Sequence, residues 1–287
     1  MKILILGSSG LLGNYLNKFL SKRFKVFNNG LRKRKVNLLN TSELDKLLLK
    51  VRPNLIINCT ANTNIDNCEF EKKNAINTNF ITLKNTVNLV KKNKLNSKFI
   101  QISTDQFYNN KIQKFNRESV NNIPNYYCKT KFFLEKFCVK NKIIVVRTNF
   151  FGATGSKNKS FTDWIYKSFR SKKKFYLFND VYFSPLNLNT LSKMLIKVIQ
   201  NIDKSRGVYN LGSRDCITKK DFAIYFAKKL KIYNNNYQSV NSKRFFNVKR
   251  PNYMCMNIKK FEKKFKVKMP SVYDQINKEI SNYKLKK

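Results

Sequence analysis

Short apolar runs alternate with amphipathic stretches through the first half of the chain. The apolar runs predict strands over residues 2–6, 24–27, 55–57, 99–102 and 143–146. The stretches between them predict helices over residues 11–21, from 41 onwards, 70–92 and 126–139. Strands that alternate with helices form a parallel doubly wound sheet, because the crossovers are right-handed. Ligands bind such sheets at the carboxyl ends of the strands, so candidate chemistry should follow each strand.

Beyond Gly152, predicted strands and helices no longer alternate regularly. Helices are predicted over residues 161–170, 191–202 and 219–230. We therefore expect an α/β fold in which a first domain with the doubly wound parallel sheet spans residues 1–152. Residues 153–287 are expected to form mainly a smaller C-terminal lobe, partly interleaved with the first domain. Neither a repeat nor a low-complexity linker separates the two.

Three of the eight glycines, Gly7, Gly10 and Gly13, directly follow the first predicted strand. Glycine allows a positive φ at a tight turn, and it lets main-chain N–H groups and the positive end of a helix approach a phosphate. The spacing GxxGxxG differs from the commoner GxGxxG of dinucleotide-binding folds, and an ordinary strand–helix turn is the alternative. The position behind a buried strand favours dinucleotide binding. We therefore expect residues 1–152 to be a Rossmann-type NAD(P)-binding domain and residues 153–287 to be mainly a substrate-binding lobe.

Composition narrows the class of protein. A chain of 287 residues with 42% hydrophobic residues can bury a substantial core. No segment approaches the roughly 18 continuous apolar residues of a transmembrane helix, and Gly7-Ser8-Ser9 interrupts the first apolar run too early for a signal peptide. The six cysteines are scattered without a CxxC pair, so we expect reduced thiols and a cytoplasmic protein. These cysteines are Cys59, Cys68, Cys128, Cys138, Cys216 and Cys255.

The formal charge of +43 raises the alternative of a nucleic-acid-binding protein, whose affinity would depend steeply on salt. The lysines are spread along the whole chain, together with an excess of asparagine, isoleucine and phenylalanine. We interpret this as a compositional bias, since no zinc-finger, KH or RRM signature accompanies it. We expect no nucleic-acid partner and no membrane partner, although the field would attract an anionic small substrate.

The chain contains no histidine, which excludes Ser-His-Asp and Cys-His catalysis and most zinc sites. Tyr127 and Lys131 offer another acid–base pair, because residues four apart share one face of the predicted helix. A nearby cation stabilises a phenolate, which makes a tyrosine a usable proton donor or acceptor. The same spacing recurs at Tyr225/Lys229 and Tyr283/Lys287. Only the first pair follows the fourth strand of the glycine-led sheet, and this position selects it.

Several segments, taken in order, resemble the extended short-chain dehydrogenase/reductase superfamily and, within it, the dTDP-4-dehydrorhamnose reductase family. The resemblance runs over nearly the whole chain, and each motif alone is weak. The segments that carry it are the GSSGLLG loop, Asn58-Cys59-Thr60-Ala61, Ile65 to Glu69, Asn77, Ser103-Thr104-Asp105, Asn125 to Lys131 with Glu135, Arg147-Thr148 with Gly152, Ser184-Pro185, Gly207 to Asn210 and Arg250-Pro251.

This resemblance implies hydride transfer from a nicotinamide cofactor to a keto group at C4 of a nucleotide-linked deoxysugar. Tyr127 would donate the proton, Lys131 would lower the tyrosine pKa and hold the nicotinamide ribose, and Thr104 would hydrogen-bond the substrate oxygen. The resemblance also implies substrate-binding residues, namely Thr104, Asp105, Asn149 and Arg250. Arg250 is the candidate for the substrate diphosphate, with an ordinary surface charge as the alternative.

The implied cofactor-binding residues are Gly7, Ser9, Gly10, Leu11, Leu12, Gly13, Arg32, Asn37, Leu38, Cys59, Thr60, Ala61, Asn77, Tyr127 and Lys131. The segment after the second strand, residues 28–32, carries no carboxylate for a ribose 2′-hydroxyl, whereas Arg32 could meet a 2′-phosphate. We therefore expect NADPH, with NADH as the alternative. Asn37-Leu38 stands where the family usually has Asp-Leu near the adenine, which leaves the adenine contact open. Met256-Asn257 also carries asparagine where the family frequently has aspartate.

Three other functions are known for proteins of the same fold, and single residues bear on some of them. A 4,6-dehydratase is disfavoured because Gln106 stands where such enzymes carry a glutamate that exchanges a proton. A 4-epimerase uses the same tyrosine and lysine and stays open, as does a non-catalytic regulatory subunit that binds a nucleotide. The resemblance makes a homodimer plausible, and it gives no residue-level support for a metal site.

Overall fold

The computed structural model describes residues 1–30, 36–108, 123–153 and 160–284. The chain divides into two compact units. Unit 1 comprises residues 1–103, 123–146 and 200–208, and unit 2 comprises residues 104–122, 147–199 and 209–287. The boundary between Ser103 and Thr104 falls at the end of a single strand.

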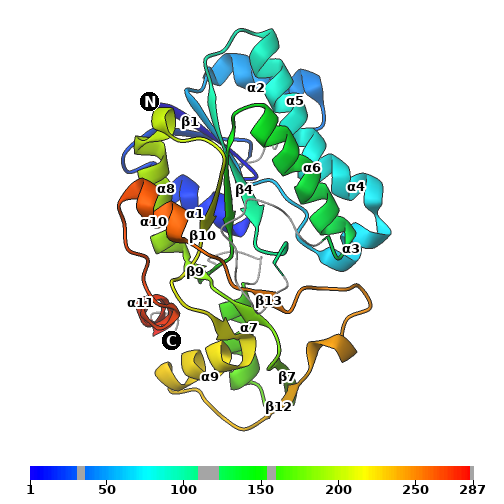
Figure 1. The fold of residues 1–287 in the computed structure, drawn as a ribbon, viewed down its shortest axis with the longest axis vertical. Helices are drawn as coiled ribbons and strands as arrows, with labels where there is room; N and C mark the ends of the chain where they lie inside the picture. Colours follow the sequence, from blue (N-terminus) through cyan, green and yellow to red (C-terminus); the bar gives the residue numbers. More distant parts are fainter. Residues whose placement is uncertain (31–35, 109–122, 154–159, 285–287) are drawn as a thin grey trace. The chain divides into compact units, whose positions relative to one another are not determined.

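The central sheet is formed, within the described residues, by six strands in the order β10-β5-β4-β3-β1-β2 (Figure 1). Their bounds are β1 Lys2–Leu6, β2 Lys25–Asn28, β3 Leu55–Asn58, β4 Lys98–Thr104, β5 Ile144–Thr148 and β10 Val208–Leu211. The pairs β1–β2, β1–β3 and β3–β4 are parallel. This confirms the predicted Rossmann-type sheet and adds the strand β10, which the sequence pattern did not reveal. The strand order reverses at β1, where such sheets bind their ligands.

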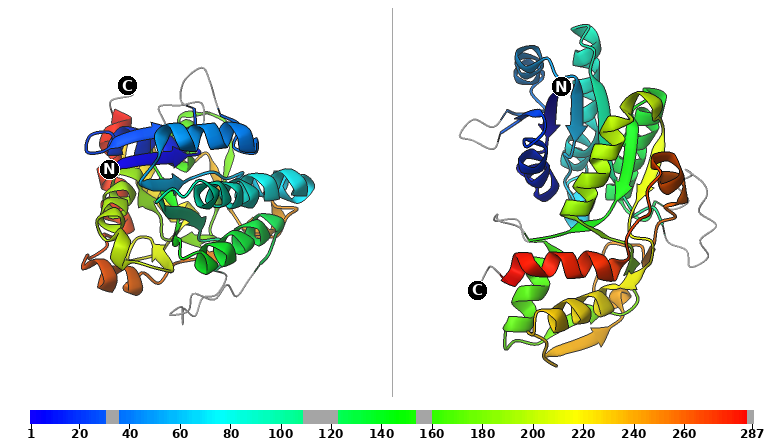
Figure 2. Two further views of the ribbon diagram at one scale, coloured as in Figure 1. Left: turned by 90° about the horizontal axis from the view of Figure 1, so that it is seen from above. Right: turned by 90° about the vertical axis from the view of Figure 1, so that its left-hand side faces the viewer.

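Amphipathic helices cover the sheet in unit 1. They are α1 Leu11–Leu20, α2 Thr41–Val51, α5 Thr82–Lys92 and α6 Tyr126–Lys140. Apolar residues of α2, α5 and α6 form one buried cluster with Leu4, Ile56, Phe99 and Val145 of the strands. The three helices run alongside one another in Figures 1 and 2.

The predicted long helix over about 70–92 is confirmed from Lys72 onwards, and it contains one π turn. The elements α4 Lys72–Ile76, the π-helix η1 Asn77–Ile81 and α5 follow one another without a break, and a separate short helix, α3 Ile65–Phe70, precedes them. Glu71 leaves the helical conformation at φ −106° and ψ 60°, which separates α3 from α4. The Thr82 hydroxyl donates to the Asn77 carbonyl at 3.1 Å, across the wider turn of the π-helix.

Unit 2 is built from helices and short strands. The helices are α7 Phe161–Arg170, α8 Leu188–Gln200, α9 Lys219–Lys229, α10 Lys259–Phe265 and α11 Val272–Lys284. The strands are β6 Phe150–Phe151, β7 Phe175–Phe178, β8 Tyr182–Phe183, β9 Leu186–Asn187, β11 Ile217–Thr218, β12 Tyr237–Val240 and β13 Tyr253–Met254. Two single-turn 3₁₀ helices, η2 Ile202–Lys204 of unit 1 and η3 Ser242–Arg244 of unit 2, complete the described elements. Among the described residues, β11, β8 and β13 form one small sheet in that order, and β7 pairs with β12.

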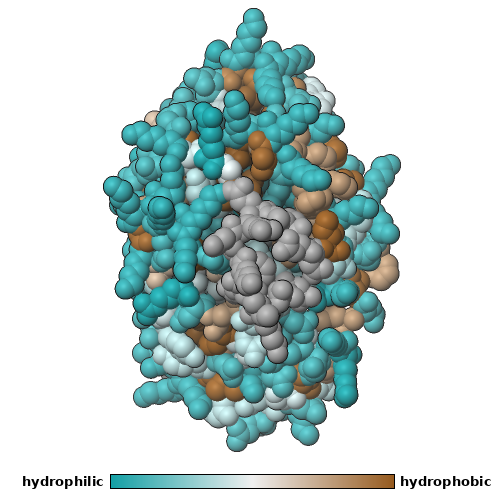
Figure 3. Space-filling view, viewed as in Figure 1, coloured by the Kyte–Doolittle hydropathy of each residue, from teal (hydrophilic) through white to brown (hydrophobic). Residues whose placement is uncertain are grey.

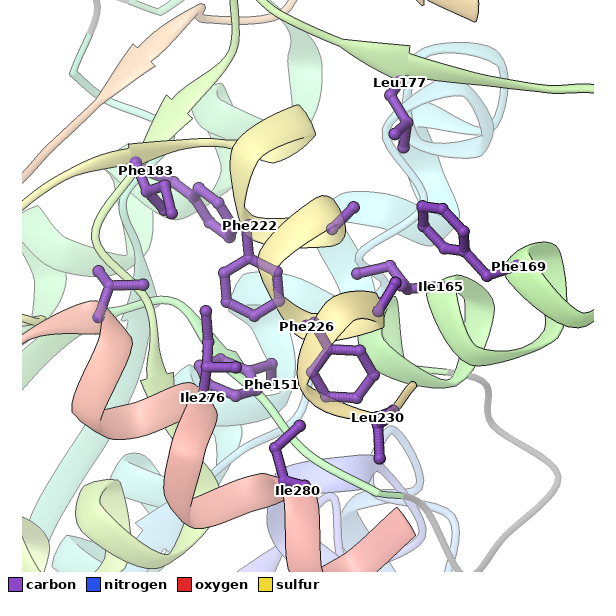
Figure 4. Close-up of a cluster of buried hydrophobic side chains, with 14 of the residues drawn as sticks. Phe151, Ile165, Phe169, Leu177, Phe183, Phe222, Phe226, Leu230, Ile276 and Ile280 are labelled. Atoms are coloured by element: carbon purple, nitrogen blue, oxygen red, sulfur yellow. The ribbon is translucent and has the colours of Figure 1, made fainter. Parts of the chain in front are cut away.

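An aromatic core holds unit 2 together (Figure 4). Side chains from α7, α9 and α11 point toward one another around Phe222 and Phe226. Phe151 meets Phe222 edge-to-face, with ring centroids 4.9 Å apart, a geometry that adds to the area that aromatic residues bury. This core gives the strands and loops of unit 2 a rigid support.

Cys216 and Cys255 form a disulfide, with Cα atoms 5.7 Å apart. The expectation that all six cysteines are reduced is therefore wrong for this pair. Cys216 precedes β11 and Cys255 follows β13, and these strands both pair with β8, which brings the two cysteines together. The other four cysteines, all in the described residues, keep their thiols.

None of the described helices combines the length and the hydropathy needed to span a membrane. On the face seen in Figure 3, hydrophilic side chains cover most of the coloured surface, and hydrophobic residues are scattered between them.

Candidate active site

The glycine loop joins β1 to α1 in a tight turn. Gly7 has a φ of +76°, which favours glycine, and the Gly10 N–H donates to the Gly7 carbonyl at 3.1 Å. The helix begins directly afterwards, at Leu11, with Gly10 as its N-cap. Main-chain N–H groups and the positive end of α1 therefore meet at the carboxyl end of β1, an arrangement suited to a phosphate.

Glycine is also required where backbones approach each other. A Cβ at Gly13 would lie 2.3 Å from the Gly7 oxygen. A Cβ at Gly7 would lie 2.7 Å from the carbonyl carbon of Cys59 and from the Thr60 nitrogen. The loops after β1 and β3 are therefore in direct backbone contact, and α1 packs onto the turn that precedes it.

Gly13→Ala is expected to lower the free energy of unfolding by about 1–3 kcal/mol, because the methyl group displaces rigid backbone. Urea unfolding followed by circular dichroism measures this. Gly10→Ala is the matched control, since a Cβ there lies 3.4 Å from the Gly7 oxygen, an ordinary contact. Equal midpoints for the two variants would contradict the close packing at Gly13.

Asn29 organises this loop, and the sequence analysis missed it. Its side-chain oxygen accepts hydrogen bonds from the Gly7 N–H at 3.0 Å, the Ser8 N–H at 3.2 Å and the Ser8 hydroxyl at 3.1 Å. Asn29 is 5% exposed and directly follows β2. An asparagine after the second strand was the available signal, although this chain is rich in asparagine.

The other cofactor-binding candidates have different surroundings. Arg32 lies outside the described residues, and Leu38 is buried in the core cluster of unit 1. The Asn37 side-chain oxygen accepts a hydrogen bond from the Leu39 N–H at 3.0 Å. Thr60 has a buried hydroxyl oxygen without a hydrogen-bond partner among the described residues, which fits a residue that awaits a ligand. The remaining candidates of this loop region are Ser9, Leu11, Leu12, Cys59 and Ala61, which lie in the glycine loop, in α1 or directly after β3.

Helix α6 carries the candidate acid–base pair and starts at a fixed position. The Asn125 side chain caps it by accepting from the Cys128 N–H at 2.9 Å. Glu69 accepts from the Tyr126 N–H at 2.9 Å. Tyr127 and Lys131 lie on the first turns of this helix and are 7% and 2% exposed.

The surroundings of Lys131 depress its basicity. Burial lowers the pKa of Lys131 to about 8, and the charge of Glu135 opposes this shift. Glu135 also accepts a hydrogen bond from the Ser103 hydroxyl at 2.5 Å, which ties α6 to the end of β4. Lys131 interacts electrostatically with Cys59, whose own pKa burial raises to about 12. The ammonium group therefore lies near the loop that contacts Gly7.

A second missed asparagine supports the same helix. Asn79, 1% exposed, accepts from the Asn62 N–H at 2.7 Å and donates to the Thr130 hydroxyl at 3.0 Å. Thr130 in turn donates to the Tyr127 carbonyl at 2.7 Å. Asn77, the predicted candidate, is half-buried at the start of η1.

In unit 2, the substrate-binding candidates gather around Asp105. The Asn149 amide donates to the Asp105 carboxylate at 2.7 Å. Thr104 and Asp105 are 4% and 2% exposed, and the Thr104 hydroxyl accepts from the Gln106 N–H at 3.2 Å. Burial raises the pKa of Asp105 to about 6, and the hydrogen bond from Asn149 opposes the rise.

Arg250 is half-buried, and its guanidinium carbon lies 3.9 Å from the centre of the Phe246 ring. Arg147, by contrast, is 1% exposed and donates to the Tyr108 hydroxyl at 2.8 Å. The Tyr108 hydroxyl in turn donates to the Asn210 side-chain oxygen at 2.7 Å. Arg147, a residue of the family motifs, therefore belongs to a hydrogen-bond network inside unit 2.

Comparisons with known proteins give matches over almost the whole chain. The family model described as the RmlD substrate binding domain matches residues 1–285. A dTDP-4-dehydrorhamnose reductase of Aggregatibacter actinomycetemcomitans is 24% identical over 299 residues, which cover 98% of this chain and 99% of that protein.

Two solved structures share the fold. A dTDP-4-dehydrorhamnose reductase from Bacillus anthracis in complex with NADP superimposes with a TM-score of 0.86 at 22% identity, covering 98% of this chain and 99% of that one. A UDP-glucose 4-epimerase from Bifidobacterium longum in complex with NAD⁺ and UDP gives a TM-score of 0.82 at 17% identity, covering 100% of this chain and 98% of that one. The shared fold alone therefore does not separate reductase from epimerase.

Proposed function

Because this chain belongs to the RmlD substrate binding domain family, we propose that it reduces the 4-keto group of a nucleotide-linked deoxysugar with a hydride from NADPH. The observation that carries this proposal is the pair Tyr127 and Lys131. Both are buried on one helix, and hydrogen bonds anchor that helix to α3 and to the end of β4. Burial distinguishes this pair from Tyr225/Lys229, whose lysine is exposed, and the position after the fourth strand distinguishes it from both other tyrosine–lysine spacings.

Several features of unit 1 fit a dinucleotide. Gly7 takes a positive φ in the turn after β1, and main-chain N–H groups at the start of α1 favour a pyrophosphate. The hydroxyl of Thr60 offers a further hydrogen bond. The described residues directly after β2, Asn29 and Gly30, include no carboxylate, which favours NADPH over NADH. The reductase structure from Bacillus anthracis holds NADP, which supports the same choice.

The proton chemistry falls to Tyr127 and Lys131. The cofactor, when bound, supplies the hydride. Tyr127 donates its phenolic proton to the oxygen that was the keto group, and the nearby ammonium of Lys131 stabilises the phenolate left behind. Lys131 also donates hydrogen bonds to the nicotinamide ribose. A desolvated ammonium stabilises a phenolate more strongly than a solvated one, because water screens less of its charge.

Unit 2 supplies the substrate contacts. Thr104 donates a hydrogen bond to the substrate oxygen, and Asp105 with Asn149 holds sugar hydroxyls. Arg250 binds the diphosphate, where a planar guanidinium pairs with two oxygens at once. These roles follow from the family resemblance, and the hydrogen bond between Asn149 and Asp105, the residue after Thr104, supports them for these three residues.

The test is NADPH oxidation at 340 nm against a panel of 4-keto nucleotide sugars. A reductase consumes one NADPH for each sugar reduced, whereas an epimerase shows no net consumption. Oxidation with none of the sugars would contradict the reductase, and tight nucleotide binding without interconversion of C4 epimers would then favour the regulatory subunit. Parallel assays with NADH test the preference for the phosphorylated cofactor. That the chain forms a homodimer and resides in the cytoplasm stays a prediction.

A further inference from the structure

Asp180, a half-buried carboxylate that the proposed reaction does not use, lies in the turn between β7 and β8. Strand β7 pairs with β12 and β8 pairs with β13, both in parallel, so this turn meets the loop between β12 and β13. Main-chain hydrogen bonds join the two connections on both sides of Asp180. The Asn179 N–H donates to the Val240 carbonyl at 3.2 Å, and the Tyr182 N–H donates to the Asn252 carbonyl at 2.7 Å.

The Asp180 carboxylate ties the two ends of residues 242–252 to each other. At the first end it accepts hydrogen bonds from the Ser242 N–H and the Ser242 hydroxyl, both at 2.9 Å. At the other end it accepts from the Asn252 side-chain amide at 2.7 Å, and this amide also donates to the Ser242 hydroxyl at 3.2 Å. Because hydrogen bonds to an ionised carboxylate are among the strong ones, this side chain closes residues 242–252 into a loop.

Ring contacts inside this loop lead to Arg250. The Phe246 ring lies against the Phe178 ring of β7, with centroids 5.2 Å apart. The guanidinium carbon of Arg250 lies 3.9 Å from the centre of the same Phe246 ring. Pro251, whose ring fixes φ, joins Arg250 to the end of the loop that Asp180 holds. Arg250 is therefore held both against β7 and at the closed end of the loop.

Such a support matters for an arginine that binds a ligand. A long side chain loses rotamer freedom when a ligand immobilises it, and a loop that becomes ordered on binding adds to this cost. A loop that is already closed by hydrogen bonds avoids most of the cost, because it is ordered before the ligand arrives. A carboxylate at the base of the loop can therefore raise the affinity for a ligand that it does not touch.

We propose that Asp180 is a positioning residue for substrate binding, because it holds the loop 242–252 in the form in which Arg250 meets the diphosphate of the sugar nucleotide. This inference rests on the proposed function, which supplies a substrate with a diphosphate and gives Arg250 its role. The sequence analysis did not indicate Asp180, since its side-chain partners lie 62 and 72 residues further along the chain.

Isothermal titration calorimetry tests this on the whole chain, without turnover. The probes are dTDP, UDP and GDP, each titrated in the presence of NADP⁺. Arg250→Met should weaken the diphosphate that wild type binds most tightly about 10- to 100-fold, the range for a lost charge-assisted hydrogen bond. Asp180→Ala should weaken it about 3- to 30-fold, because the arginine and its loop then become ordered only on binding. The affinity for NADP⁺ should not change in either variant.

A double-mutant cycle separates positioning from a general loss of stability. If Asp180 acts through Arg250, Asp180→Ala should weaken the diphosphate in wild type and have little further effect in Arg250→Met. A merely structural role would weaken binding equally in both backgrounds. Asp274→Ala is the matched control, since Asp274 also accepts from a serine N–H of unit 2, that of Ser271 at 3.1 Å, but at the start of α11. This control should bind the diphosphate as wild type does.

A swap of two side chains checks the hydrogen bonds themselves. Asp180→Asn puts an amide where two donors need an acceptor, so it should weaken the diphosphate. Adding Asn252→Asp restores a donor and an acceptor in reversed order, and the affinity should return toward that of wild type. Amide hydrogen exchange within residues 243–252 should be faster in Asp180→Asn than in wild type and slower again in the swapped protein.

The inference fails if Asp180→Ala, shown to be folded by circular dichroism, binds the diphosphate as wild type does, or if it keeps its full effect in the Arg250→Met background. It also fails if Arg250→Met has no effect or if wild type binds none of the probes. Should Asp180→Ala not fold, Ser242→Ala replaces it in the cycle, because it removes the hydroxyl that donates to Asp180.

The proposed function fails separately. A wild-type protein that binds a diphosphate through Arg250 and Asp180 but oxidises no NADPH with any 4-keto sugar would refute the reductase. The positioning role of Asp180 would then still stand.

Discussion

Tyr127→Phe is expected to lower the rate of NADPH oxidation about 10²- to 10⁴-fold, the usual contribution of a positioned general acid. Phenylalanine keeps the ring that packs at the start of α6 and removes only the hydroxyl that donates the proton. The side chain is 7% exposed, so water has little room to replace the missing donor. The affinity for NADPH should change little, because the glycine loop and Lys131 are untouched.

Single-turnover rates and NADPH binding, followed by fluorescence, measure the two quantities separately. Tyr126→Phe is the matched control, since it removes a hydroxyl one residue earlier on the same helix. That variant should retain wild-type turnover. If Tyr127→Phe turns over like wild type, another group donates the proton, and the assignment of the pair is wrong.

Much of the fold could be predicted because local patterns report it directly. The run Leu55-Ile56-Ile57 is a buried strand, and the structure extends it by only one residue. Helix α7 has the predicted bounds, since Ser160 and Asp163 form a capping box at its start. The break at Glu71 gave no such signal, because neither glycine nor proline marks it. The strand β10 is short and follows η2, so an alternation of long elements did not reveal it.

Candidate site residues could be predicted where the residue types and their position were distinctive in the sequence. They were missed where the residue type is common throughout the chain. Tyr127 and Lys131 stand out because histidine is absent and because they follow the fourth strand. Asn29 and Asn79 make the hydrogen bonds that hold the surrounding loops, yet asparagine is abundant throughout the chain. Their roles depend on contacts between residues far apart in sequence, which no local pattern records.

The disulfide shows the same limit. Cys216 and Cys255 are separated by 39 residues, and nothing in their flanking sequences pairs them. Six cysteines allow many pairings, so spacing alone could not select this one. The pairing depends on strand β8, which lies between β11 and β13 in the small sheet of unit 2.

Lys131→Met is expected to lower kcat/KM by about 10²- to 10⁴-fold and to abolish a pH dependence that wild type shows. Lys131 has a pKa of about 8, so its ammonium form is lost as the pH rises through this value. If the charge assists proton donation, wild-type reductase activity falls above about pH 8, and the activity of the variant does not fall there. Lys129→Met, an exposed lysine on the same helix, should keep the wild-type profile.

The titration of Lys131 also predicts that the stability of the folded protein increases with pH. The pKa of Lys131 is lowered on folding, from 10.5 to about 8. Between these values the unfolded chain binds a proton that the folded protein does not, so the unfolding free energy increases with pH in this window. Lys131→Met lacks this titrating group. The unfolding free energy of wild type minus that of the variant should therefore increase by about 3 kcal/mol from pH 8 to pH 10.5. Urea unfolding at both pH values measures it, and subtracting the variant cancels the titration of the other lysines. A difference that stays constant over this range would mean that Lys131 keeps its proton, and with it the charge that the proposed mechanism needs, at any working pH.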